Sequence, residues 1–320
     1  MSSSESESKH KSKSKSKIKV ESSDFDTESE SESESDIEVD VLGINGLVRK
    51  NNTCYLNSLL QILTHIPCII SYFKKQFKEN LIVDEESSLS ELLHKLIDVQ
   101  FSNTNSKITP STIIKWLKNN TYFNVHEQQD CHEVLMIILD KLHQELKYKL
   151  VFKTDITDIR LKNGFKHLNE EYSYIYEQFY GIYNVDDKTC EPNSNLILDI
   201  PETNNSNESI TLEDCISASK ISINVYPNIL IIMLKRYQEV NGKIIKRLTK
   251  VLYSELLIFE SKTYQLEGVI IHNGSRITDG HYTAISKHYD SYYKFNDKQC
   301  YKVKSSFDKN AYMLFYSLVN

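Results

Sequence analysis

One cysteine stands at the predicted start of a helix, where a thiol can act as a nucleophile. Cys54 precedes a segment whose leucines recur at spacings of three and four, the pattern of one apolar helix face: Leu56, Leu59, Leu60 and Leu63. Asn52 or Thr53 can cap this helix. Amide N–H groups and the dipole at a helix N-terminus favour a thiolate and can hold a developing oxyanion. Because most buried cysteines are inert core residues, Cys54 needs a base before it counts as catalytic.

A candidate base lies in the segment "DGHYTAISKHYDSYYKFND". His281 follows Gly280, so a strand can begin there with little side-chain obstruction. A turn around 289–291 would pair two strands as a hairpin and return Asn296 or Asp297 beside His281. A side-chain oxygen there could accept the imidazole N–H and orient the ring, as in a Cys-His-Asn/Asp triad. Taken alone, His281 is one of ten histidines, and a satisfied surface residue is the simpler interpretation.

The elements that must bring these residues together change type along the chain. Apolar periodicity predicts helices in the first third, over residues 55–63, 88–101 (opened by Ser88 or Ser90), 109–119 and 126–150. After about residue 170, short segments rich in Tyr, Ile, Leu and Val predict strands over 179–185, 195–201, 228–237, 263–272, 280–288, 291–297 and 311–319, with one helix at 211–219. This order predicts an α+β fold with a mainly antiparallel sheet and a cleft between the helices and the sheet.

The first 40 residues differ in composition from the rest. They are low-complexity Lys-Ser and Ser-Glu alternations with few apolar residues, so we expect a disordered charged tail over 1–40 and the catalytic domain over 41–320. The tail is either an interaction segment or, as we favour, a solvated linker. The formal net charge of -6 arises in the tail, and the remainder is neutral. Electrostatic attraction to nucleic acid is therefore not expected of the domain.

Cysteine usage and hydropathy suggest a compartment. The six cysteines form no C-x-x-C pair, no signal-peptide pattern opens the chain, and the longest apolar run, "ILIIML", is too short to span a bilayer. We expect a soluble intracellular protein, cytoplasmic or nuclear, with reduced thiols and no membrane partner.

Six segments, in order, match the motifs of one enzyme family. They are the cysteine box "GLVRKNNTCYLNSLLQ", "QQDCHEVL", "PNILIIMLKRY", the histidine box "LEGVIIHNGSRITDGHY", "YYKFND" and "AYMLFY", and together they extend over residues 46–316. Each segment is moderate support alone, whereas their joint occurrence is specific. The chain resembles the ubiquitin-specific proteases, a papain-like class of deubiquitinating cysteine proteases.

The resemblance implies a fold, a reaction and roles for residues. The fold would be papain-like, with a helical thumb, an antiparallel β palm and shortened fingers. The reaction would be hydrolysis of the isopeptide or peptide bond after the C-terminal glycine of ubiquitin. Cys54 would be the nucleophile and His281 the general base. Asn296 matches the third triad member, and the adjacent Asp297 could assist by supplying a negative charge.

The position five residues before Cys54 departs from the family. An asparagine there lends an amide N–H to the oxyanion, whereas this chain has Arg49; Asn52 is the other candidate donor. A guanidinium facing the site would be a charge-assisted donor, and one facing solvent would contribute nothing. Losing one such donor costs about 2.7–4 kcal/mol of transition-state stabilisation. A weak or inactive ubiquitin-binding pseudoenzyme, or a protease for another ubiquitin-like modifier, therefore stays open.

The resemblance also implies how a substrate is held. Gln128, Asp130, Tyr237 and Tyr282 match positions near the tail of bound ubiquitin, although capping of the following helix is the plainer role for Gln128 and Asp130. Many family members carry a zinc ribbon of two C-x-x-C pairs. This chain has one cysteine in that region, Cys190, so we expect no zinc and no other cofactor. The remaining cysteines (Cys68, Cys131, Cys215 and Cys300) are interpreted as packing residues. The expected partners are ubiquitin and ubiquitinated proteins, bound by a monomer.

Overall fold

The structure is a computed structural model that describes residues 41–77, 88–102, 107–148, 158–170, 172–203, 208–240, 242–276 and 279–319. The chain divides into two units, Met1–Asp36 and Ile37–Asn320. The predicted charged tail over 1–40 lies outside the described residues. All the described residues belong to the second unit.

The helices precede most of the strands, as the sequence predicts. They are α1 (Cys54–Leu63), α2 (Pro67–Lys75), α4 (Leu89–Ser102), α5 (Ser111–Asn120), α6 (Cys131–Leu146), α7 (Ile159–Glu170), α8 (Tyr174–Phe179) and α9 (Leu212–Ser219). Ser88 caps α4 by accepting from the N–H of Glu91. The predicted start of α6 at residue 126 is wrong, because Asp130 has an extended backbone and caps the helix that begins at Cys131. Helices α2, α7 and α8 were not predicted.

One sheet dominates the strands, and its described part has eight of them. Their order is β16 (Gln299–Val303), β15 (Ser291–Asn296), β14 (Asp279–His288), β13 (Lys262–Arg276), β17 (Ala311–Val319), β8 (Ile229–Lys235) and β5 (Leu196–Asp199), with β12 (Leu256–Phe259) also paired to β13. The β5–β8 pair is parallel, and the other pairs are antiparallel. The predicted antiparallel sheet is therefore confirmed.

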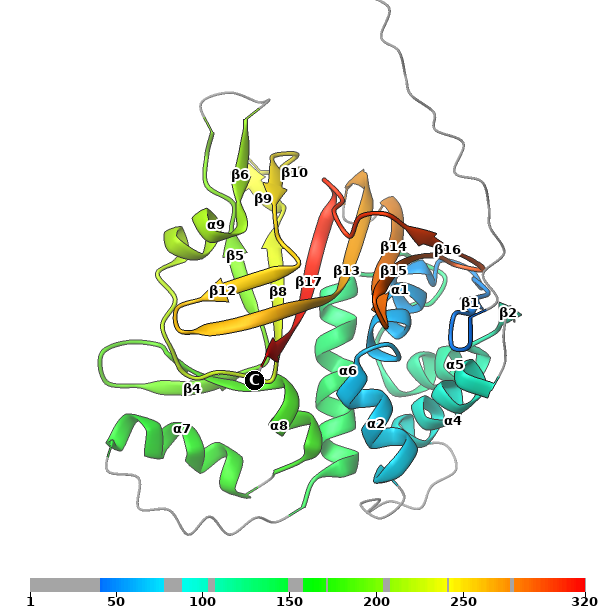
Figure 1. The fold of residues 1–320 in the computed structure, drawn as a ribbon, viewed down its shortest axis with the longest axis horizontal. Helices are drawn as coiled ribbons and strands as arrows, with labels where there is room; N and C mark the ends of the chain where they lie inside the picture. Colours follow the sequence, from blue (N-terminus) through cyan, green and yellow to red (C-terminus); the bar gives the residue numbers. More distant parts are fainter. Residues whose placement is uncertain are drawn as a thin grey trace, which may run out of the picture. The chain divides into compact units, whose positions relative to one another are not determined.

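The smaller strands form four further sheets in the described residues. These are β1 (Gly46–Leu47) with β2 (Lys107–Ile108), β9 (Tyr237–Val240) with β10 (Lys243–Lys246), β6 (Ser209–Thr211) with β11 (Lys250–Leu252), and β3 (Gly181–Asn184) with β4 (Cys190–Asn193) and β7 (Ile223–Val225). In Figure 1, α1 lies beside β14 and β15, and α2, α4 and α5 lie on the side of α1 away from the sheet.

Two hydrophobic clusters cover the two faces of the main sheet. On β13, Ile270 belongs to the cluster that contains α1 and α6, whereas its neighbour Val269 belongs to the cluster on the other face with α9. Successive strand residues point to opposite faces, so burial on both faces produces the near-continuous apolar strands. All ten residues of α1 are buried, and α1 packs on β14. This packing places the start of α1 against the start of β14.

Among the described residues, no single helix has the length and hydropathy needed to cross a membrane. The bent pair α1 and α2, whose axes differ by 78°, meets those two criteria only when both helices are taken together.

Candidate active site

A tight loop delivers Cys54 to the first position of α1. Asn51 has a positive φ of 57°, which asparagine tolerates better than most residues. Thr53 occupies the N-cap position, but its hydroxyl bonds the backbone of Lys50 and does not cap the helix. The prediction that Asn52 or Thr53 caps this helix is therefore wrong, because the helix has no side-chain cap and the Asn52 side chain bonds Arg49 and His126. Cys54 is fully buried at the positive end of the helix dipole.

His281 and Asn296 meet because β14 and β15 form the predicted hairpin. His288 pairs with Ser291 across a two-residue turn, and the register brings the start of β14 beside the end of β15. The Nε2 atom of His281 lies 2.6 Å from Oδ1 of Asn296, so the expected approach of these residues is confirmed. With Nε2 bonded to the amide, Nδ1 is the ring nitrogen left for the thiol.

The Cys54 side chain interacts with the His281 ring, although the two residues are far apart in the sequence. This interaction raises the pKa of His281 above its ordinary value, burial of the ring opposes the rise, and the hydrogen bond to Asn296 adds to it. The residues that sequence reasoning named as nucleophile, base and third member therefore form one connected chain of contacts.

Asp297 lies next to this chain of contacts. Its Oδ2 is 4.0 Å from Nε2 of His281, while Oδ1 accepts a 2.8 Å bond from Nδ2 of Asn57. Asn57 is a buried residue on α1, one turn after Cys54, that the sequence analysis missed. Its place in the cysteine box, on the same helix side as Cys54, was the signal that could have found it. Asp297 thus adds negative charge near the ring without orienting it directly.

The two side chains predicted to donate to the oxyanion, Arg49 and Asn52, already donate hydrogen bonds to other groups of the protein. The Nδ2 of Asn52 donates to the carbonyl of His126 at 2.7 Å, so one of its two amide N–H donors is already used. The Arg49 guanidinium donates to the carbonyl of Asn51 at 2.8 Å and to Oδ1 of Asn52 at 3.0 Å. Its Nη1 lies 3.5 Å from Nδ1 of His281. The Arg49 guanidinium is therefore held between the loop before α1 and the His281 ring, and it does not point into open solvent.

The four predicted tail-contact residues have different environments. Asp130 is half-buried, caps α6, and accepts from the Tyr312 hydroxyl on both oxygens at 2.9 Å. Gln128 donates from Nε2 to the carbonyl of Gly280 and thereby holds the residue before His281; it does not cap the helix. Tyr237 is half-buried. The Tyr282 ring is 1% exposed, so its side chain is a packing residue here and not a surface contact.

A second histidine lies beside the start of β14, and sequence reasoning missed it. The buried His272, on β13, bonds the Tyr237 hydroxyl through Nδ1 at 2.6 Å. Lys246 donates to the carbonyls of His272 at 2.7 Å and Gly274 at 2.8 Å. A Cβ on Gly280 would lie 2.5 Å from Nε2 of His272, so only glycine fits this close approach.

The cysteines do not gather into a metal site in the described part of the chain, and no cluster of three or more His, Cys, Asp or Glu side chains there could hold a metal ion. Cys131, Cys190 and Cys215 are buried, and Cys68 and Cys300 are half-buried. Burial raises the pKa of Cys68 and of Cys215 to about 11, which keeps these thiols protonated at neutral pH.

Comparisons with known proteins agree with this geometry. The family model "Ubiquitin carboxyl-terminal hydrolase" matches residues 45–316. Ubiquitin carboxyl-terminal hydrolase 17-like protein A of Mus musculus is 26% identical over 313 residues, covering 85% of this chain and 56% of the relative. Ubiquitin carboxyl-terminal hydrolase 12 of Salmo salar is 29% identical over 341 residues, covering 85% and 88%. The chain spans about half the length of the mouse relatives it matches.

A solved structure shares the fold. The structure of the SAGA Ubp8/Sgf11/Sus1/Sgf73 DUB module matches with a TM-score of 0.68 and 23% identity, covering 87% of this chain and 68% of that chain. The likeness confirms the expected α+β papain-like fold. The family model covers most of the chain, and the chain therefore belongs to the ubiquitin carboxyl-terminal hydrolase family.

Proposed function

We propose that this chain is a deubiquitinating cysteine protease that hydrolyses the isopeptide or peptide bond after the C-terminal glycine of ubiquitin. The observation that carries the proposal is the contact chain from Cys54 through His281 to Asn296 at the start of a buried helix. The similar mouse and salmon proteins are named ubiquitin carboxyl-terminal hydrolases, and one structure of similar fold is described as bound to ubiquitin aldehyde.

In the first half of the reaction, His281 takes the thiol proton of Cys54 at Nδ1 and becomes an imidazolium. The thiolate attacks the carbonyl carbon of the terminal glycine, and the carbonyl oxygen becomes an oxyanion. The backbone N–H of Cys54, at the start of α1, is one donor to that oxyanion. Asn296 holds the ring through Nε2, so that the Nδ1 proton faces the leaving nitrogen.

In the second half, the oxyanion collapses, the carbon–nitrogen bond breaks, and the proton on Nδ1 passes to the departing amine. The neutral ring then takes a proton from water, which attacks the thioester. The second tetrahedral intermediate releases the glycine carboxylate and returns the proton to the Cys54 sulfur. The resting enzyme is restored, and no metal or organic cofactor is needed for this scheme.

The ubiquitin tail would bind beside the N-terminus of α6, where the Asp130 side chain is half-buried. The Asp130 carboxylate is fixed by Tyr312 and by the first turn of α6, and it is partly exposed. A fixed carboxylate suits bidentate pairing with an arginine of an extended basic tail. We therefore assign Asp130 and the half-buried Tyr237 to the tail channel, and place Gln128 behind it as a support for Gly280.

The test is reaction with a ubiquitin derivative that carries a C-terminal electrophile, together with hydrolysis of a ubiquitin–fluorophore amide. We expect the wild type to gain the mass of one ubiquitin at Cys54 and to release the fluorophore. Cys54→Ser should do neither. Cys68→Ser is the matched control, because its half-buried thiol has a raised pKa, and it should behave as wild type.

Two other outcomes would point to the alternatives. Retention of ubiquitin without labelling would support a pseudoenzyme of the same fold. Preferential labelling by an electrophile of another modifier with a Gly-Gly end, in direct competition, would reassign the substrate. We further propose that the protein is a monomer and acts inside the cell. We propose no nucleic-acid partner, since residues 41–320 carry balanced charge. Light scattering of the purified chain tests the monomer.

A further inference from the structure

Arg49 stands where its charge acts on the catalytic base. The side chain is exposed, yet three contacts fix its guanidinium: the carbonyl of Asn51, Oδ1 of Asn52 and the Nδ1 side of the His281 ring. Asn52 is itself anchored, because its amide donates to the carbonyl of His126. The fork of the guanidinium matches this set of acceptors, and a lysine could not reach all three at once.

The position opposes the first proton transfer. Nε2 of His281 donates to Asn296, so the lone pair on Nδ1 must receive the thiol proton of Cys54. A guanidinium is always protonated, so Nη1 can only donate toward that lone pair. It therefore competes with the thiol for Nδ1, and it would repel the imidazolium that the transfer creates.

The same charge favours the next step. Once the thiolate attacks, the negative charge moves to the substrate oxygen near the start of α1. Nδ1 of His281 is then protonated and can no longer accept from Arg49. Both changes drive the guanidinium away from the ring and toward the oxyanion. A charged donor is stronger than the amide that the family's asparagine would provide.

We infer that Arg49 is a charge switch of the active site: in the resting enzyme it suppresses the thiolate–imidazolium pair, and during catalysis it moves to the oxyanion. The second half of this inference rests on the proposed function, whereas the first half concerns only the reactivity of Cys54. The consequence is a thiol that is protected from small electrophiles until a substrate carbonyl is present.

The other titratable groups around the His281 ring do not supply the positive charge that Arg49 places beside Nδ1. Cys54, on α1, raises the pKa of His281 most, and Asp297, directly after β15, raises it further. His272, on β13, has its pKa lowered to about 4, mainly by burial, and is neutral in the working range. Among the described groups that face the ring, Arg49 is therefore the one that bears a positive charge at neutral pH.

The test separates thiol reactivity from peptide-bond chemistry. Iodoacetamide is neutral and alkylates a thiolate without forming an oxyanion, so its rate at Cys54, followed by mass spectrometry between pH 5 and 9, reports the ion pair alone. For Arg49→Met we expect the plateau rate between the acidic and alkaline limbs to rise about three- to tenfold above wild type, because the imidazolium that accompanies the thiolate is no longer repelled. Hydrolysis of the ubiquitin–fluorophore amide should move the opposite way and fall about tenfold or more.

Lys50→Met is the matched control. It removes the same charge one residue along, but its ammonium bonds Ser111 and not the ring, so its profile should overlay that of wild type. Arg49→Lys keeps the charge without the fork and should fall between wild type and Arg49→Met. An unchanged plateau rate in Arg49→Met, or an equal rise in Lys50→Met, would overturn the resting role. Faster hydrolysis by Arg49→Met would overturn the oxyanion role. A wild type that alkylates normally but hydrolyses no ubiquitin amide would sink the proposed function and leave the comparison of plateau rates intact.

Discussion

Helix α1 has histidine side chains near each of its ends, His281 at its start and His65 with His288 at its end. The histidines at the two ends have opposite roles. At its start, His281 is half-buried, contacts a thiol and an amide oxygen, and has a raised pKa. At its end, His65 is fully buried, and both ring nitrogens face backbone carbonyls, of Gln61 at 2.7 Å and Gly43 at 3.2 Å. Burial lowers the pKa of His65 to about 4, and the neighbouring His288 adds to the effect.

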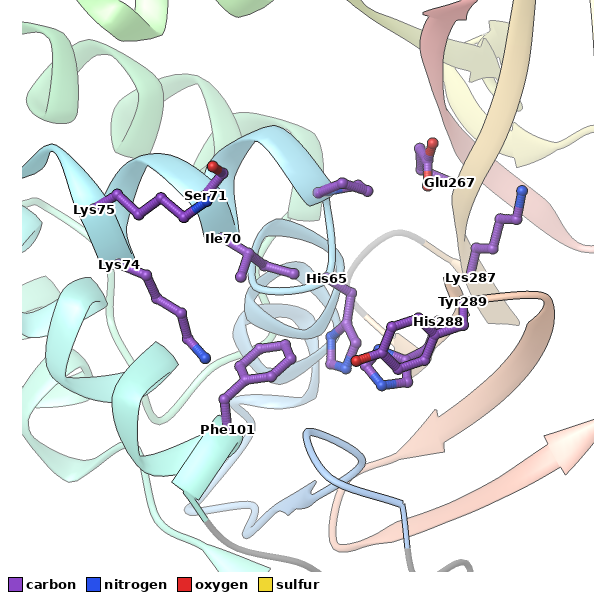
Figure 2. A pocket seen from close by; sticks show the side chains of 11 residues that line it. His65, Ile70, Ser71, Lys74, Lys75, Phe101, Glu267, Lys287, His288 and Tyr289 are labelled. Carbon is purple, nitrogen blue, oxygen red and sulfur yellow. The ribbon is translucent and has the colours of Figure 1, made fainter.

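The histidines at the end of α1, His65 and His288, join distant segments of the chain. The Nε2–H of His288 donates to the backbone carbonyl of Leu42 at 3.0 Å, so the two rings tie the beginning of the domain to α1 and β14. They line a cavity of about 470 Å³ together with Phe101 and Tyr289 (Figure 2). The difference shows what makes a histidine a base: partners that stabilise its charged form and partial access to solvent. A histidine buried among neutral groups is held uncharged and serves packing.

The largest expected effect comes from removing the base at the first end. His281→Gln should lower hydrolysis of a ubiquitin–fluorophore amide by at least about 10³-fold, because no group remains to accept the Cys54 proton. Thermal stability should change little, since the ring is half-buried and lies at the site. His65→Gln is the reciprocal variant. It should keep activity within about threefold and lose stability, and a comparable loss of activity there would erase the distinction between the two ends.

The second effect is a pH dependence of stability that belongs to His65. The unfolded ring takes up a proton as pH falls through about 6.5, whereas the folded ring resists until about 4. The unfolded state thus binds more protons in this window. The contribution is fully present above pH 6.5 and is lost as pH falls, by up to about 3 kcal/mol.

Urea unfolding followed by the fluorescence of Trp116, at several pH values between 4 and 7, measures this loss. The free energy of unfolding should fall less steeply with acid in His65→Gln than in wild type, by about that amount. His126→Gln, at an exposed position, should retain the slope of the wild type. Parallel slopes in wild type and His65→Gln would show that His65 is protonated in the folded state.

The sequence predicted one end of α1 far better than the other. Cys54, His281 and Asn296 lie in motifs, and the hairpin that joins the last two follows from strand alternation around a short turn. The contact between His65 and His288 has no local signal, because it depends on how α1 packs against the far end of β14. Helix α2 was missed because it has just three fully buried residues, Ile69, Tyr72 and Phe73, too few for a clear periodic pattern.

Side-chain directions at the site were also beyond the sequence. A motif places Arg49 and Tyr282 near Cys54 and His281, but it does not say which way they point. The direction of Arg49 is set by three acceptors on two segments. Tyr282 packs against the rings of His272, on the neighbouring strand β13, and of Tyr312, on β17. Such directions depend on tertiary packing, which a single sequence does not display.

The smallest effect separates Asn296 from Asp297 at the catalytic end. Asn296→Ala removes the bond that orients His281 and should lower kcat/KM by about 10²-fold. Asp297→Asn keeps an oxygen for the Asn57 amide and removes only a charge 4.0 Å from the ring. That charge raises the pKa of His281, so its loss should lower the pKa and move the alkaline limb of kcat/KM to lower pH.

Activity of Asp297→Asn at neutral pH should fall by less than about tenfold, since the orienting bond to Asn296 remains. Asp290→Asn makes the same change in the exposed turn at the other end of the hairpin, and its pH profile should match that of wild type. A loss in Asp297→Asn as large as that in Asn296→Ala would transfer the orienting role to the carboxylate. The charge next to the ring, and not the amide bonded to it, would then be what distinguishes His281 from His65.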